Sequence, residues 1–162
     1  MVGDQDTFAL FAELSLGLAG FAGVAAAFGG RDRSFGPGDR NRLLGIFVCA
    51  SATLAGCVLV LTLSSTHTPV QSVYWITSAL LFVTSAMASF TRVPINYRLA
   101  RDPKASIEPW AAHLASAFFA TLLFLYGGNL WLGGEAWPLL AGFSLQLLFG
   151  LWLFTRILTR PN

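Results

Sequence analysis

The chain has 162 residues, of which 55% are hydrophobic and only 11% are charged. Soluble domains carry about 25% charged residues, so this chain has too few charges to cover the surface of a soluble fold of its length. Its formal net charge of +2 argues against a nucleic-acid partner, because nucleic acids bind strongly basic surfaces. Together with a mean hydropathy of +0.64, this composition predicts an integral membrane protein whose main partner is the lipid bilayer.

Five apolar segments are long enough to cross the hydrocarbon core as helices, which takes about 20 residues. They run over about 7–28, 43–64, 72–90, 109–126 and 137–155. Glycine and proline separate them, as at Gly29–Gly30, Pro94 and Gly127–Gly128. None of them alternates apolar and polar residues as the strands of a membrane barrel do. The sequence therefore predicts an all-α fold, a transmembrane bundle of five helices that forms one membrane domain over residues 1–162.

The ten Lys and Arg residues predict how this bundle is oriented. Four lie in residues 29–42, four in residues 91–108 and two near the C-terminus, whereas the N-terminal tail and the other two connections have none. Basic residues concentrate in cytoplasmic loops, so we expect the N-terminus outside and the C-terminus in the cytoplasm. We expect the membrane to be a bacterial cytoplasmic (inner) membrane.

The first predicted span contains a carboxylate, Glu13, in a stretch that is otherwise apolar or small. On a helix, Gly17 and Gly20 share its face and Gly23 lies on the neighbouring stripe. Small residues at this spacing let another helix approach closely, so we expect Glu13 in a helix interface or a water-filled cavity. His67, in the next outer connection, is the nearest cationic candidate in predicted depth. A hydrogen-bonded structural role and a cation or proton site both remain open, because an ionisable group in a span is costly and is a functional hypothesis by default.

Gln146 is the deepest strongly polar side chain, near the middle of the fifth predicted span. It could form a helix–helix hydrogen bond without any further function. It could also contact a substrate or line a pore. We therefore group it with Glu13 and His67 as the candidate polar or pore-lining residues.

Residues 91–108 are predicted to form a cytoplasmic loop, in which Arg92, Asn96, Tyr97 and Arg98 are the candidate docking residues. Such a loop could contact anionic lipid headgroups or bind a partner protein. The tetrapeptide VPIN within it resembles the VPxN-type segment that follows the third helix in anthrone-oxygenase-like membrane proteins. This resemblance covers only the loop and implies no role for any residue here.

The sequence contains no HExxH, CxxC or Walker A motif, so we predict no catalytic residue, no metal site and no cofactor. The function that we favour is a homo-oligomeric ion channel, in which Glu13 forms an acidic outer ring for monovalent or divalent cations. One alternative is a structural or assembly subunit that binds partner membrane subunits. Another is a membrane enzyme or carrier for a lipid-soluble small molecule.

Overall fold

The computed structural model describes residues 2–32, 36–66, 68–102 and 108–159, and within the first helix the side chains of residues 5–27. These residues form five α-helices: α1 (Val2–Asp32), α2 (Pro37–Ser64), α3 (Val70–Arg101), α4 (Pro109–Trp131) and α5 (Ala136–Leu158). All five are long and apolar enough to cross a membrane. The prediction of an all-α membrane protein with five spans is therefore confirmed.

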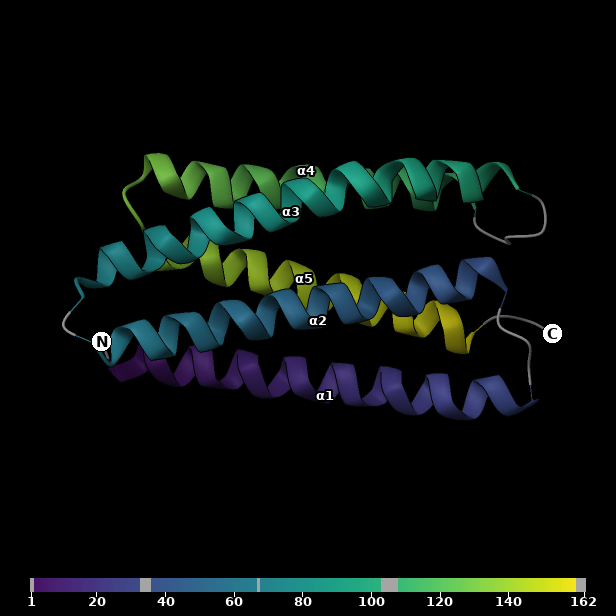
Figure 1. The fold of residues 1–162 in the computed structure, drawn as a ribbon, viewed down its shortest axis with the longest axis horizontal. Coiled ribbons are helices and arrows are strands. Elements are labelled where there is room, and N and C mark those ends of the chain that lie inside the picture. Colours follow the sequence, from purple (N-terminus) through teal and green to yellow (C-terminus); the bar gives the residue numbers. More distant parts are fainter. Residues whose placement is uncertain (1, 33–35, 67, 103–107, 160–162) are drawn as a thin grey trace.

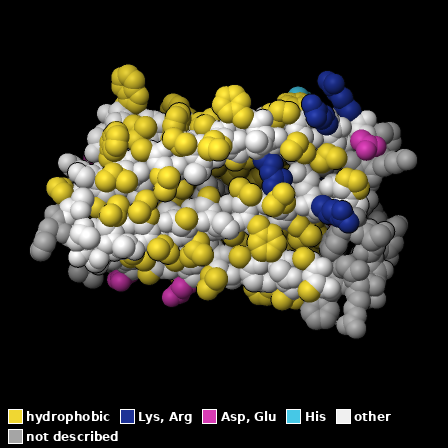
Figure 2. Space-filling view, in the orientation of Figure 1, with side chains coloured by type: hydrophobic (Ala, Val, Ile, Leu, Met, Phe, Trp, Pro, Cys, Tyr) yellow, Lys and Arg dark blue, Asp and Glu magenta, His cyan; other side chains and the backbone are white. Residues whose placement is uncertain are grey.

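The helices run along the length of an elongated bundle, and the two chain ends lie at opposite ends of it (Figure 1). The helix α3 packs most extensively on α4, whereas α2 packs on both α1 and α5. The Lys and Arg side chains of the visible face gather toward the end that holds the C-terminus (Figure 2). We call this the basic end, and it is formed by the last turns of α1, α3 and α5 and the first turns of α2 and α4.

The third helix is longer than predicted, so the expected loop of residues 91–108 is wrong for residues 91–101. These residues continue α3, with Pro94 inside the helix. A proline removes one backbone hydrogen bond from a helix, but contacts made on both sides of Pro94 offset that loss. Val93 packs against the main hydrophobic cluster, Asn96 bonds to α2 and Tyr97 contacts His113 of α4.

Two glycine pairs that were expected to end helices lie inside them. Gly29–Gly30 belongs to α1 and Gly127–Gly128 to α4. Gly127 faces the Phe82 ring of α3, and a Cβ atom there would lie 3.0 Å from that ring. The chain turns instead at Gly133 and Gly134, whose φ angles of 81° and 89° favour glycine.

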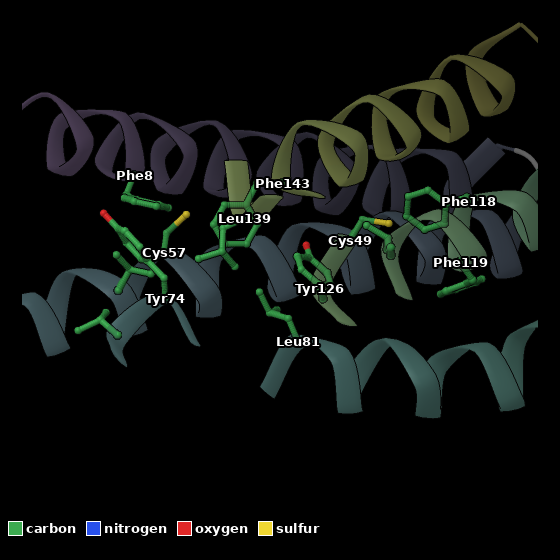
Figure 3. Packing of buried hydrophobic residues seen from close by; sticks show 13 residues of the cluster. Phe8, Cys49, Cys57, Tyr74, Leu81, Phe118, Phe119, Tyr126, Leu139 and Phe143 are labelled. Atoms are coloured by element: carbon green, nitrogen blue, oxygen red, sulfur yellow. The ribbon is translucent and has the colours of Figure 1, made fainter. Parts of the chain in front are cut away.

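The hydrophobic core runs along the bundle axis (Figure 3). Phe8 of α1 contacts the rings of Tyr74 and Phe143, with centroid distances of 5.8 Å and 6.1 Å. Toward the basic end, Phe118 and Phe149 stack at 4.0 Å. The core thus joins residues from all five helices, and it fixes how they are arranged around the basic end.

Candidate functional site

A cavity of about 70 Å³ lies at the basic end between α2, α3, α4 and α5, with room for a few water molecules or one small chemical group. The helices α4 and α5 are joined by the Gly133–Gly134 turn at the other end of the bundle. They move apart toward the basic end (Figure 1), where the cavity lies. Its lining is part polar and part apolar. The polar lining residues are Asn41, Arg42, Arg92, Asn96, Glu108 and Arg156.

The polar and apolar parts of the lining lie at different depths. On α2, Asn41 is two helical turns nearer the basic end than Cys49, and on α5, Arg156 is two turns nearer than Phe149. The deeper lining is made of small and aromatic side chains such as Ala115. The cavity is therefore amphipathic, with a polar mouth and an apolar floor. On the face shown in Figure 2, one basic side chain lies in a hollow among hydrophobic side chains.

Arg92 is the central cation of this cavity. Its Nη1 donates a hydrogen bond to Oδ1 of Asn41 at 2.8 Å, and Nδ2 of Asn41 donates one to Oδ1 of Asn96 at 2.7 Å. Arg92 is half-buried, and no carboxylate among the described residues forms a salt bridge with it. A guanidinium has five N–H donors, so most of its hydrogen-bonding capacity is available to a ligand.

The other two arginines of the lining are already paired with carboxylates. Arg42 forms a salt bridge with the buried Asp39, with an N–O distance of 3.1 Å. Arg156 pairs with Glu108. The guanidinium of Arg156 also lies over the rings of Trp110 and Trp152, at 5.0 Å and 5.9 Å from their centroids. This cation–π contact helps to hold Arg156 at the mouth.

The four candidate docking residues have different surroundings in the structure. Arg92 and Asn96, one helical turn apart, both line the cavity. The Tyr97 hydroxyl lies 3.0 Å from Nδ1 of His113, so Tyr97 joins α3 to α4. Arg98 is exposed. This polar stretch is therefore the last part of α3, and two of its four candidate residues line an internal cavity.

Of the six polar cavity residues, the sequence does not identify four, namely Asn41, Arg42, Glu108 and Arg156. In the sequence the two basic ones indicate only the cytoplasmic side. One signal was present, because Asn41 and Arg42 directly precede the apolar run of the second span. Their partners are far away in the sequence, however, and no local pattern identifies them.

Among the described residues of the monomer, Glu13 does not lie in a helix interface, and the expected packing role of its helix face stays a prediction for contacts outside the monomer. Glu13 is exposed, and a Cβ atom at Gly17, Gly20 or Gly23 would meet no atom within 4 Å. The reason is that α1 packs through the opposite face, where Leu18 lies against Gly150 of α5. At this contact the residue without a side chain is Gly150 of α5, and a Cβ atom there would lie 2.8 Å from Leu18.

The packed face of α1 is formed by side chains that recur every seven residues. Phe8, Ser15 and Ala22 are fully buried. Because α1 begins at Val2 and not near residue 7, Glu13 lies about 16 Å from the helix start at 1.5 Å per residue.

Gln146 and Thr53 join α5 to α2 in the middle of the bundle. Thr53 Oγ1 donates a hydrogen bond to Gln146 Oε1 at 2.7 Å, and both side chains are buried. This is the helix–helix hydrogen bond considered above, and Gln146 does not line the cavity. His67 lies outside the described residues. Of the two described candidates, Glu13 is exposed on α1 and Gln146 is buried against α2, so these two lie apart.

The described part of the chain contains no group of three or more His, Cys, Asp or Glu residues that could hold a metal ion. The chain matches no protein-family model, no curated protein and no solved structure. The features of the described residues that point to a function are the cavity at the basic end and the outward face of α1.

Proposed function

We propose that this membrane protein binds an anionic amphiphile in the cavity at its basic end, as a binding protein or carrier for a lipid-soluble molecule. The observation that carries the proposal is the half-buried Arg92 guanidinium, which has an amide partner but no carboxylate partner among the described residues. A partly desolvated charge without a counter-charge is unfavourable. An anionic group from the membrane would supply that counter-charge.

The surroundings of Arg92 favour a ligand that comes from the bilayer. The cavity lies between spanning helices, and its floor is apolar. Basic pockets between transmembrane helices on the cytoplasmic side bind anionic lipid headgroups. The positive-inside rule predicts that the basic end faces the cytoplasm, where the leaflet is rich in anionic lipids.

The test compares lipid retention by the wild type and by Arg92→Gln. The purified full chain is reconstituted with equal amounts of phosphatidylglycerol and phosphatidylcholine, and the lipid retained in mild detergent is counted by native mass spectrometry. We expect the wild type to retain phosphatidylglycerol preferentially. We expect Arg92→Gln to reduce that retention about tenfold, because it removes a charge-assisted hydrogen bond.

Arg98→Gln is the matched control, because Arg98 is on the same helix but exposed and outside the cavity. This variant should retain phosphatidylglycerol as the wild type does. Equal losses in the two variants would show only a general effect of surface charge. Equal retention by the wild type and Arg92→Gln would contradict the proposed site.

A second candidate function is a homo-oligomeric cation channel, and the outward face of α1 favours it. Glu13, Gly17 and Gly20 all point away from the monomer. A carboxylate that faces lipid is costly, and association of several α1 helices would cover it. In a ring of such helices, Glu13 would supply the negative charges that attract cations.

Currents through reconstituted bilayers test this second function. If Glu13 lines a pore, Glu13→Gln should lower the preference for cations, whereas Asp6→Asn, a change nearer the helix start, should change it less. Gly20→Leu should also disrupt the oligomer in size-exclusion chromatography. Absence of current from the wild type would exclude a channel. Recovery of the chain with a defined partner protein would favour the assembly subunit.

A further inference from the structure

The charges around the cavity are almost balanced before any ligand binds. Three guanidinium groups belong to its lining, those of Arg42, Arg92 and Arg156. Asp39 pairs with the first and Glu108 with the third. Among the described charged groups at the site, one positive charge therefore remains, and Arg92 carries it.

We infer that the cavity selects an amphiphile with a single negative charge, a phosphodiester or a carboxylate, over one with a doubly charged phosphomonoester. This inference rests on the proposed function, because it specifies the ligand of the same site. A singly charged group brings the site to neutrality. The second charge of a phosphomonoester would have no partner there, and an unpaired charge in a partly buried site is unfavourable.

The salt bridges Arg42–Asp39 and Arg156–Glu108 leave these two arginines less able than Arg92 to bind an anionic ligand. Asp39, the partner of Arg42, is buried, and removing its counter-charge would leave a buried carboxylate without that partner. Arg156 is held between Glu108 and the Trp110 and Trp152 rings. A ligand thus meets one uncommitted guanidinium instead of a cluster of three.

The size of the cavity supports a small head group. About 70 Å³ of space does not hold a whole phospholipid, so the bulk of the ligand must lie outside, against the bilayer. The apolar floor near Phe119 and Phe149 offers contact to hydrocarbon. Both features favour an anionic group that is attached to a hydrocarbon chain.

Glu108→Gln tests the charge argument, because it removes one carboxylate and raises the charge of the site by one. Glu108 is exposed at the start of α4 and makes no side-chain cap hydrogen bond there. The full chain is exposed to pairs of lipids at about pH 8, where a phosphomonoester carries nearly two negative charges. Native mass spectrometry then measures the ratio of phosphatidylglycerol to phosphatidic acid retained, and oleate is tested separately as the carboxylate.

For the wild type we expect phosphatidylglycerol or oleate to be retained about tenfold more than phosphatidic acid, the ratio that corresponds to one charge-assisted contact. Glu108→Gln should shift the ratio toward phosphatidic acid by a similar factor. Arg156→Gln, which lowers the charge instead, should weaken retention of all the anions. Preference for oleate over phosphatidylglycerol would identify the single charge as a carboxylate and would equally support the inference.

Different results would contradict charge selection and the proposed binding site. Suppose that anion retention requires Arg92, but that the ratio of phosphatidylglycerol to phosphatidic acid is the same in the wild type and in Glu108→Gln. That result would overturn charge selection and leave the proposed binding site standing. A wild type that retains phosphatidic acid best would also overturn charge selection. If no anionic amphiphile is retained by the wild type, both proposals fail.

Discussion

At the residue scale, a few buried polar side chains join helices that the hydrophobic core alone would leave free to slide. Asn129 is one of them, and it is fully buried near the end of α4. Its Nδ2 donates to Ser78 Oγ at 2.7 Å and to the Glu135 carbonyl at 3.0 Å, and its Oδ1 accepts from the Glu135 amide at 2.8 Å. One amide group thus fixes the α4–α5 turn and ties it to α3.

We predict that Asn129→Ala lowers the free energy of unfolding by about 2 kcal/mol, because it leaves the buried Ser78 hydroxyl and the Glu135 amide without their partner. Unfolding in detergent micelles, followed by loss of helical circular dichroism, measures the change. Thr121→Ala is the control, because the exposed Thr121 hydroxyl bonds only to its own helix. Its effect should stay within about 0.5 kcal/mol, and equal effects would show that Asn129 does not join the helices.

At the scale of the elements, the position of each glycine decides whether it matters for packing. Gly142 of α5 lies against the Tyr126 ring of α4, and a Cβ atom there would come within 2.5 Å of it. Tyr126 is fully buried, so its ring has little room to move. Gly20 of α1 has the same helical setting but no neighbour within 4 Å.

We therefore predict that Gly142→Ala destabilises the monomer by about 1–3 kcal/mol through overpacking, whereas Gly20→Ala leaves it unchanged or slightly more stable. Thermal unfolding of the two variants under conditions that keep the protein monomeric makes the comparison. Equal loss of stability would mean that α1 packs through its glycine face after all, contrary to the contacts of Leu18 and Gly150.

At the scale of the whole molecule, the odd number of helices places the two termini at opposite ends of the bundle (Figure 1). The same arrangement brings the first turns of α2 and α4 together with the last turns of α3 and α5. Polar residues are tolerated near the ends of membrane spans, and those at the ends of four separate helices lie around one cavity. The proposed binding site is thus a property of the bundle and not of any one segment.

The sequence by itself determined the fold class and the number of helices. Both follow from local properties, namely the length and hydropathy of each segment, and the five predicted segments all lie within the observed helices. Helix ends were less predictable. Pro94 and Gly127–Gly128 are local signals for a break, but contacts of Tyr97 and Phe82 with neighbouring helices keep the chain helical there.

Only the tertiary structure decided which polar and small residues work together. Asn41 and Arg92 are 51 positions apart, and Glu108 and Arg156 are 48 apart, so no periodicity within one helix relates them. For the same reason the spacing of the glycines in α1 does not reveal that the helix turns this face outward in the monomer. Side-chain pairing depends on how each helix is rotated about its axis, and that rotation is set by the complementary shapes of its neighbours.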